Sequence, residues 1–260
     1  MGISVVINTY NAEKYLERVL QSVNGFDEIV VCDMESTDRT VEIAQKYGCK
    51  LLTFEKGNHK SAEPARTFAI QSASNDWVLV VDADELVTSA LRDYLYEQIQ
   101  NPDCPSGLYI PRKNYMFGQW MKFLYPDHQL RFFKRAGTVW PHYVHTFPKV
   151  EGKVAKIPKK RHDLALIHLP HDLTGTFRRL NLYSDNEVEK RKGTHVGYFK
   201  LLCYPVFHFF KFYILKGAIF SGKLGVIQAQ RVAFYKYMVM AKIYEDEMKG
   251  KCKEDNYGKL

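Results

Sequence analysis

The sequence predicts an α/β fold in which a mostly parallel central sheet is covered by helices on both faces. Three observations favour this fold. Short β-branched runs alternate with helical patterns through the first half of the chain, one run is continuously apolar, and polar residues follow the ends of three runs. Such alternation is typical of parallel sheets, because a crossover helix joins each strand to the next.

The strands are expected at four places in the first half. Residues 3–7, 29–32 and 50–54 are β-branched or apolar runs, and residues 77–81 are apolar without interruption. An uninterrupted run is typical of a central strand covered on both faces. Asn11 is the expected N-cap of the first helix. No G-x-G-x-x-G sequence follows the first strand, so a Rossmann dinucleotide site is not expected.

The alternation weakens in the second half, where aromatic residues and prolines become frequent. A polar helical pattern covers residues 174–192, an apolar and aromatic stretch covers 198–220, and a last helical pattern covers 226–248. We therefore expect an α/β domain at residues 1–195 and a C-terminal helical extension at residues 196–260.

The composition limits the classes of partner. The chain has 260 residues, a formal net charge of +8 and an isoelectric point near 9.1. This charge suits nucleic acid, anionic lipid or a phosphorylated small molecule. The lysines do not cluster with aromatic residues in an RNA-binding motif, so nucleic acid is not expected. Five cysteines without a C-x-x-C pair, and no signal-peptide pattern, predict a reducing, cytoplasmic setting.

Polar clusters follow three of the expected strands. Ligands of open α/β sheets bind beyond the carboxyl ends of the strands, so these clusters are the candidate site. They are Thr9-Tyr10-Asn11 after the first strand, residues 33–38 after the second, and Asp82-Ala83-Asp84 after the apolar strand.

Asp82 and Asp84 are the residues that point most directly to chemistry. Two neighbouring carboxylates raise each other's pKa unless a cation or hydrogen bonds compensate. A hard divalent cation, Mg²⁺ or Mn²⁺, compensates them and keeps coordination positions open for the oxygens of a diphosphate. The simpler alternative is a solvated turn, which the polar clusters at the neighbouring strand ends disfavour.

Three stretches resemble the inverting glycosyltransferases of family 2, which have the GT-A fold, and notably the lipopolysaccharide-core β-1,4-glucosyltransferase group. They are VVINTYN at 5–11, VCDMESTDRT at 31–40 and VVDADE at 80–85. The resemblance implies that residues 1–195 are a GT-A catalytic domain. It also implies a UDP-sugar donor, with UDP-glucose favoured.

The resemblance implies roles for individual residues. Asp33 would accept a hydrogen bond from a uracil-like base, Asp82 would face the ribose, and Asp84 would hold the metal with Asp82 as the second candidate ligand. Arg66 would approach the diphosphate, and its place near the start of an expected helix favours this independently. The implied nucleotide-sugar-binding residues are Thr9, Tyr10, Asn11, Asp33, Arg66, Asp82, Ala83 and Asp84.

A further block, residues 125–135 followed by His145, resembles the same family with one departure. Relatives commonly have Glu directly after this His, whereas this chain has Thr146. A general base must be a carboxylate or an imidazole within reach of the attacking hydroxyl. We therefore expect Asp127 as the catalytic base with the catalytic His145 nearby, and Glu151 as a more distant alternative.

These features predict an inverting, metal-dependent transfer of a hexose from a UDP-sugar to a hydroxyl of a glycolipid or lipopolysaccharide-core-like acceptor. A nearby alternative is transfer to polyprenyl phosphate, an anion that needs no strong base, and Thr146 favours it. An alternative of another class is a non-catalytic basic protein that binds membranes or nucleic acid.

Residues 201–210 carry no charge, but Lys200, Lys211 and Lys216 interrupt any span near the ~20 apolar residues that a transmembrane helix needs. Two interpretations stay open. The segment lies in a membrane interface, or it covers the sheet of the catalytic domain. The first predicts a cytoplasmic protein held peripherally on the inner face of the cytoplasmic membrane. The sequence leaves the oligomeric state undetermined.

Overall fold

The computed structural model describes the chain in two compact units, Met1–Pro170 and His171–Leu260, and each is described here by itself. The described residues are 1–57, 63–141, 147–170, 172–191 and 193–249.

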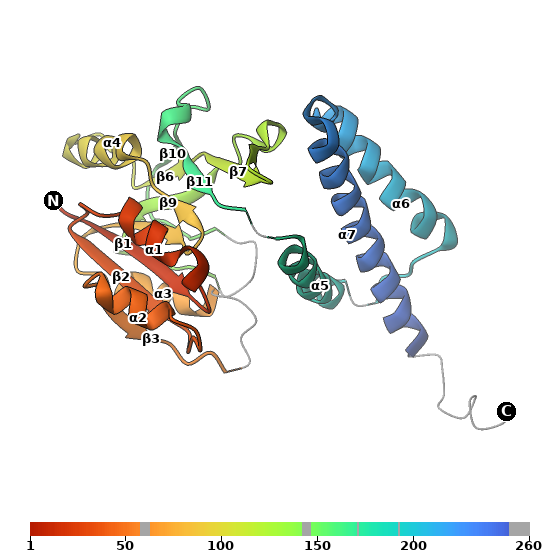
Figure 1. Ribbon diagram of the computed structural model, residues 1–260, viewed down its shortest axis with the longest axis horizontal. Coiled ribbons are helices and arrows are strands. Elements are labelled where there is room, and N and C mark those ends of the chain that lie inside the picture. Colours follow the sequence, from red (N-terminus) through yellow and green to blue (C-terminus); the bar gives the residue numbers. More distant parts are fainter. Residues whose placement is uncertain (58–62, 142–146, 171, 192, 250–260) are drawn as a thin grey trace. The chain divides into compact units, whose positions relative to one another are not determined.

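The first unit contains a seven-stranded sheet in the order β10-β6-β9-β4-β1-β2-β3 (Figure 1). Its strands are β1 (Ile3–Thr9), β2 (Glu28–Asp33), β3 (Lys50–Thr53), β4 (Trp77–Asp82), β6 (Gly107–Ile110), β9 (Gln129–Lys134) and β10 (Val154–Lys156). Strands β4, β1, β2 and β3 are parallel, and β10 is parallel to β6. Strand β9 runs antiparallel to both of its neighbours. The predicted mostly parallel sheet is confirmed.

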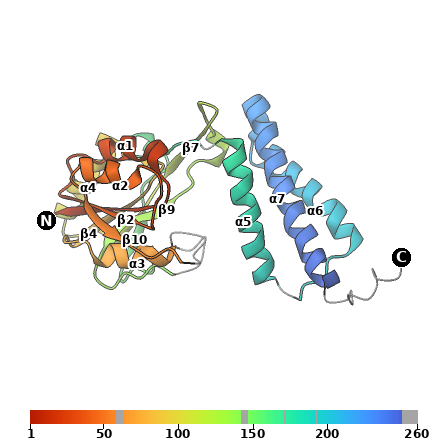
Figure 2. The ribbon, with the colours of Figure 1, turned by 60° about the horizontal axis from the view of Figure 1, so that its bottom comes forward.

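The sheet is continuously apolar at its centre because helices cover both faces. These helices are α1 (Glu13–Ser22), α2 (Thr40–Lys46), α3 (Glu63–Gln71) and α4 (Ser89–Gln100). Alternate residues of β1 enter different cores: Val5 packs with Leu16 of α1 and Leu91 of α4, whereas Val6 packs with Ala69 of α3. Figure 2 shows the same layers, with α1, α2 and α4 on one face and α3 on the other.

A smaller sheet, in the order β5-β11-β7-β8, lies beyond the end of β4. Its strands are β5 (Glu85–Leu86), β7 (Arg112–Met116), β8 (Gln119–Trp120) and β11 (Leu166–His168). In its register His168 lies opposite both Glu85 and Asn114. Because β5 begins three residues after Asp82, this sheet brings polar side chains to the carboxyl end of the central strand.

The expected N-cap at Asn11 is wrong. Helix α1 begins at Glu13, its N-cap residue is Ala12, and Asn11 has a left-handed backbone with φ of 49°. The N–H groups at the start of α1 bond instead to the end of the second polar cluster and the start of α2: Glu13 donates to Asp38 and Ala12 donates to Thr40. The loops after β1 and β2 are thus tied together.

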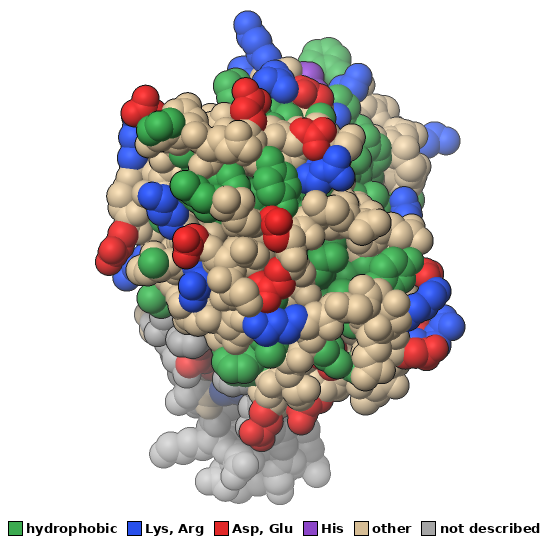
Figure 3. All heavy atoms as spheres, turned by 90° about the vertical axis from the view of Figure 1, so that its left-hand side faces the viewer, with side chains coloured by type: hydrophobic (Ala, Val, Ile, Leu, Met, Phe, Trp, Pro, Cys, Tyr) green, Lys and Arg blue, Asp and Glu red, His purple; other side chains and the backbone are tan. Residues whose placement is uncertain are grey.

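Charged side chains of both signs are interspersed on the face of the first unit seen in Figure 3. Charged side chains of the first unit also pair across neighbouring elements, such as Lys46 with Glu17 and Lys50 with Glu28. The positive charge of the chain is therefore not gathered into one patch on this face.

The second unit is helical, with α5 (Leu173–Lys190), α6 (Tyr198–Phe210), a π-helical turn η3 (Lys211–Leu215), a short 3₁₀ turn η4 (Ala218–Ser221) and α7 (Gly222–Lys249). Helices α5 and α6 both pack on α7, and Val196, Val239, Met240 and Ile243 form the core. Among the described residues, no helix combines the length and the apolar character that crossing a membrane requires.

The structure divides after Pro170, whereas the sequence predicted a boundary after residue 195. The two boundaries assign helix α5 to different units. Helix α5 packs on α7 through Val188, at the core of the second unit, and through the rings of Phe177 and Phe234. A polar contact that sequence periodicity does not reveal adds to this packing. Lys242 of α7 reaches Asp185 of α5 at 2.6 Å and Ser184 at 2.8 Å. Helix α5 therefore belongs to the helical unit.

Gly225 allows η4 to lie directly against α7, because a Cβ at this position would come within 1.8 Å of the Ala218 carbonyl oxygen. Alanine normally stabilises a helix interior relative to glycine by about 1 kcal/mol. Here we expect the opposite: Gly225→Ala should lower the free energy of unfolding by about 1–3 kcal/mol, measured by urea denaturation.

Gly197→Ala is the matched control, because its Cβ would meet no atom within 4 Å. Its free energy of unfolding should change by less than about 1 kcal/mol. A Gly225→Ala protein as stable as the wild type would contradict the close packing of η4 on α7.

Candidate active site

The three predicted polar clusters meet at one edge of the sheet. Parallel pairing places Thr9 opposite Asp33, and Asn8 opposite Asp82. The carboxyl ends of β1, β2 and β4 are therefore level with one another, as the sequence predicts.

Asp33 is buried and held in a fixed orientation. Its carboxylate accepts hydrogen bonds from the Thr9 hydroxyl at 2.8 Å and from the Ser36 amide and hydroxyl at 2.8 and 2.6 Å. A carboxylate has about four acceptor positions, so one further donor can be accommodated. The structure thus brings Thr9 and Asp33 into direct contact.

Tyr10 and Asn11 differ in what they offer to a ligand. The Tyr10 ring is exposed, and the Lys56 ammonium lies 4.7 Å from its centroid. The Asn11 side chain accepts a 2.8 Å hydrogen bond from the Thr37 amide, and the Asn11 amide donates to the Ser36 hydroxyl. Asn11 therefore joins two loops, whereas Tyr10 presents an open aromatic face.

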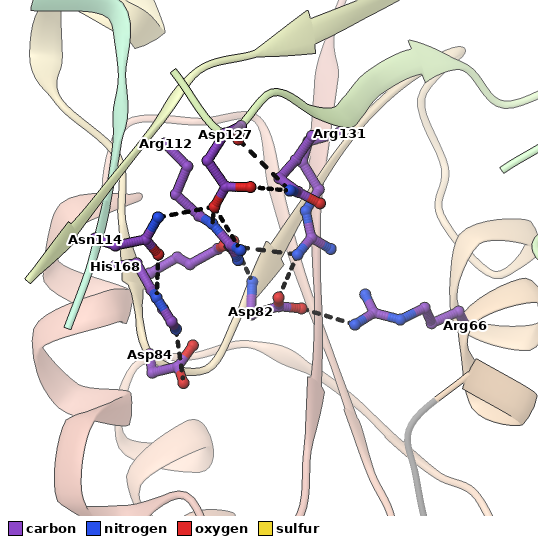
Figure 4. Close-up of polar contacts among 10 residues, drawn as sticks. Arg66, Asp82, Asp84, Arg112, Asn114, Asp127, Arg131 and His168 are labelled. Atoms are coloured by element: carbon purple, nitrogen blue, oxygen red, sulfur yellow. Dashed lines mark hydrogen bonds and ion pairs between the residues drawn. The ribbon is translucent and has the colours of Figure 1, made fainter. Parts of the chain in front are cut away.

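Asp82 lies between two guanidinium groups (Figure 4). Arg66 of α3 donates to one carboxylate oxygen at 2.8 Å, and Arg131 of β9 donates to the other. Burial alone would raise the pKa of Asp82, but Arg131 and Arg66 hold that pKa far below its ordinary value. For Asp82, arginines supply the compensating charge that the sequence analysis assigned to a metal.

The same two arginines have further N–H donors that are not used in bonds to Asp82. Arg66 and Arg131 are buried, and the Nε and Nη1 atoms of each have no hydrogen-bond partner among the described residues. Trp140 lies against both, with its ring centroid 4.5 Å from the Arg66 guanidinium carbon. Buried N–H donors without acceptors are costly, so this corner is suited to an anion with several oxygens.

Asp127 is surrounded by donors. Its carboxylate accepts hydrogen bonds from Arg112 at 2.9 Å, from Asn114 at 2.8 Å and from Gln129 at 3.0 Å. Burial raises the pKa of Asp127, but Arg112 and the hydrogen bonds outweigh it, so the pKa lies below its ordinary value. Arg112 also pairs with the fully buried Glu85 at 2.9 Å.

Asn114 connects Asp127 to His168 and so to Asp84. Because the Asn114 amide nitrogen donates to Asp127, its oxygen faces His168 Nδ1 at 2.8 Å and accepts that N–H. The other ring nitrogen, Nε2, lies 3.5 Å from a carboxylate oxygen of Asp84. Figure 4 shows this line of side chains from Asp127 to Asp84.

Ala83 lies in the turn between β4 and β5, between the two acidic residues. Among the described residues, no three His, Cys, Asp or Glu side chains cluster as a complete metal-binding group. His145 and Thr146 lie outside the described residues.

Four residues of this site were not predicted from the sequence: Arg131, Arg112, Asn114 and His168. Arg131 stands inside the block that resembles the family, which was a usable signal. The other three lie on the short strands β7 and β11, which have no recognisable periodicity.

Comparison with known proteins gives consistent matches. A family model described as "Glycosyl transferase family 2" matches residues 4–177. The chain is 27% identical over 253 residues to "Lipopolysaccharide core biosynthesis glycosyltransferase LpsC" of Rhizobium meliloti (strain 1021), covering 94% of this chain and 93% of the relative. It is 27% identical over 278 residues to "Uncharacterized glycosyltransferase RT0209" of Rickettsia typhi (strain ATCC VR-144 / Wilmington), covering 98% and 91%.

Among solved structures, the chain is similar to "Mannosyltransferase PcManGT from Pyrobaculum calidifontis in complex with GDP-Man and Mn2+". The TM-score is 0.54 with 14% identity, over 94% of this chain and 87% of that one. It is also similar to "Crystal structure of S. aureus TarS", with a TM-score of 0.50 and 19% identity over 99% of this chain and 56% of that one.

Asp82→Asn tests the balance of charge at the end of β4. The substitution leaves the buried Arg66 without its anion and leaves Arg131 with Glu85 alone, at 3.5 Å. The free energy of unfolding should therefore fall by about 3–5 kcal/mol. Asp93→Asn is the control, because Asp93 is 67% exposed and pairs with Arg92 at the surface. Its change should stay below about 1 kcal/mol.

The stabilisation by Asp82 should depend on pH in one direction. Because its pKa is lowered in the folded state, the contribution is present at neutral pH and is lost as the pH falls below the ordinary value of 3.8. The wild type should therefore lose more stability than Asp82→Asn in this acid range. Equal acid sensitivity of the two proteins would contradict the assignment.

Proposed function

This chain belongs to glycosyl transferase family 2 and has the GT-A fold, and on that premise we propose that it transfers a hexose from a UDP-sugar to a hydroxyl of a glycolipid or lipopolysaccharide-core-like acceptor. The transfer depends on a divalent metal and inverts the anomeric carbon. One observation carries the proposal: Asp33, Asp82 and Asp84 meet at the carboxyl edge of the sheet, beside two arginines with unpaired donors.

The nucleotide lies across the ends of β1 and β2. Asp33 accepts the N3–H of uracil in addition to its bonds from Thr9 and Ser36, which fix the direction of its carboxylate. Tyr10 offers the base an exposed aromatic face. The solved mannosyltransferase of similar fold holds GDP-Man, which supports a nucleotide-sugar in this fold without deciding the base.

The diphosphate lies beside Arg66 and Arg131. Their buried Nε and Nη1 groups are the N–H donors that would bond to the diphosphate oxygens. Their pairing with Asp82 holds both guanidinium planes in place. Charge-assisted hydrogen bonds of this kind strengthen as negative charge builds on a departing diphosphate.

Asp84 and His168 fit a divalent cation. Two ligands that are each about 2.0–2.2 Å from one ion lie roughly 3–3.5 Å apart, and the observed separation of His168 Nε2 from Asp84 is 3.5 Å. His168 also donates its other N–H to Asn114, as metal-binding histidines do. Asp82 is a less suitable ligand, because both of its oxygens already accept from arginines.

Mg²⁺ or Mn²⁺ bound there would neutralise charge on the leaving diphosphate. The solved mannosyltransferase of similar fold contains Mn²⁺, which supports a divalent cation in this fold. The residues of the chain hold the donor in place around that position.

Asp127 serves as the base that accepts the proton of the acceptor hydroxyl. Its lowered pKa keeps it ionised at neutral pH, and Arg112, Asn114 and Gln129 hold its orientation. A weak but positioned carboxylate suits a step in which the proton moves only as the new bond forms. His145 is the alternative base.

The acceptor is proposed from the relatives. The relative of Rhizobium meliloti is named as a lipopolysaccharide core biosynthesis glycosyltransferase and is similar along nearly the whole chain. Such an acceptor is anchored in a membrane, so the enzyme would act at the inner face of the cytoplasmic membrane through peripheral contact.

Asp84→Asn should abolish UDP-glucose turnover and leave the melting temperature unchanged within a few degrees. His168→Asn should weaken Mn²⁺ affinity by at least about tenfold, measured by electron paramagnetic resonance of free Mn²⁺. Asp93→Asn is the matched surface control for both. Unchanged Mn²⁺ affinity in both site variants would reject the metal assignment.

The same protein preparation tests the proposed UDP-sugar donor. It also tests whether the chain is a transferase or a non-catalytic binding protein. With Mn²⁺, UDP should raise the melting temperature of the wild type and an RNA oligonucleotide should not. Turnover of UDP-glucose should exceed that of GDP-mannose. Product formed on polyprenyl phosphate alone would favour the alternative transferase.

Asp127→Asn should lower kcat by about 10²–10⁴-fold, because it removes the proton acceptor without removing the donor site. The affinity for UDP should stay at the wild-type value, measured by calorimetry. His145→Gln is the comparison. A large loss in His145→Gln, with little change in Asp127→Asn, would transfer the role of base to His145.

A further inference from the structure

The positive charge of this chain is concentrated in one segment. Residues 190–244 contain ten Lys and Arg and no Asp or Glu. The remainder contains 27 Lys and Arg against 29 Asp and Glu, so the net positive charge comes entirely from this segment. The segment includes α6, the turns η3 and η4, and most of α7.

Helix α6 presents apolar side chains to solvent along one side. Tyr198, Leu202, Val206 and Phe210 follow at intervals of four residues, so they lie on neighbouring turns of the same face. They are 82%, 58%, 51% and 52% exposed. Helices of water-soluble domains usually place polar residues on the outer face, so this face is prepared for an apolar contact.

The exposed face continues into a groove between α6 and α7. The groove has a volume of about 570 Å³. Leu202, Val206 and Phe209 line it from α6, and Phe234 and Tyr237 line it from α7. No charged side chain lines it, so it offers an apolar recess beside an apolar ridge.

The turn that joins α6 to α7 is also apolar and is flanked by cations. Phe220 is 91% exposed and Leu215 is 78% exposed. Lys216 and Lys223, both exposed, stand on either side of η4. Gly225 lets η4 pack closely against α7, so the turn is part of the packed second unit.

Two further lysines border the apolar side of α6. Lys200 and Lys211 are eleven residues apart, close to three helical turns, so they project from nearly the same side. The Lys211 ammonium lies 5.8 Å from the Phe207 ring centroid. Long lysine side chains can reach outward from such positions while their stems cover apolar surface.

We propose that α6 and the η3–η4 turn form a docking surface for an anionic lipid bilayer. Helix α6 lies in the plane of the interface, with its apolar side and Phe220 among the acyl chains. Lys200, Lys211, Lys216 and Lys223 contact the phosphates of the head groups. Apolar burial and attraction to anionic lipid act together in such helices.

The charge pattern favours a bilayer over a second copy of the chain. In a symmetric dimer the same patch meets itself, so lysines would face lysines. No acidic residue of residues 190–244 is available to pair with them. An anionic lipid surface supplies the opposite charge at every position. The docking surface lies wholly within the second unit and is independent of the reaction proposed above.

Flotation of the full chain with phosphatidylcholine vesicles, with and without phosphatidylglycerol, tests the proposal. The wild type should bind the anionic vesicles, and high salt should weaken the binding. Leu215→Ser with Phe220→Ser should reduce binding at least about tenfold. Lys216→Gln and Lys223→Gln should each reduce binding to anionic vesicles about fivefold at low salt.

Matched controls lie in the first unit. Phe117→Ser changes another exposed phenylalanine, and Lys14→Gln with Lys153→Gln changes two other exposed lysines. Both control proteins should bind as the wild type does, and every variant should keep the wild-type circular dichroism spectrum. UDP-glucose hydrolysis in solution should also be unchanged, which separates a failure of docking from a failure of the reaction.

Three results would overturn the proposal. The first is that the wild type does not bind anionic vesicles. The second is that the Leu215 and Phe220 variant binds them as the wild type does. The third is that light scattering shows a dimer of the wild type, and that this variant is monomeric but still binds vesicles. The last result would assign the surface to a second copy of the chain.

Discussion

The pairing of two buried arginines with one carboxylate at the end of the central strand is the constraint on which the first unit depends. Arg66 and Arg131 are buried, and Asp82, the last residue of β4, is partly buried between them. Buried cations are tolerated only with close counter-charges, and Asp82 supplies one to a helix and a strand that are distant from it in sequence. The pairing joins α3 and β9 at the edge where a nucleotide-sugar would lie.

A continuous polar network extends from this pair to the other candidate groups. The Asp82 amide bonds to Glu85, Glu85 pairs with Arg112, and Arg112 holds Asp127. Asn114 then links Asp127 to His168 beside Asp84. One network thus orients the proposed diphosphate, base and metal positions. Changes at any member are expected to be non-additive with changes at the others.

The two units divide the properties of the chain between them. The first has nearly balanced charges and gathers its buried polar groups at one edge of a sheet. The second has a small core, a surplus of cations and large exposed apolar side chains. The proposed transfer to a membrane-anchored acceptor would require both an ordered site and a means of staying at the lipid surface. The composition of the two units is consistent with that proposal.

The sequence alone determined the four parallel strands β1 to β4, the helices that cover them, and the meeting of Asp33, Asp82 and Asp84 at one edge. These follow from local periodicity and from the rule that parallel strands end together. Only the tertiary structure decided that Asp82 is neutralised by arginines and that Asn114 and His168 join Asp127 to Asp84. Arg131 is 49 residues from Asp82, and His168 is 54 from Asn114. Such contacts depend on strand register and on the antiparallel insertion of β9, and no local pattern encodes either.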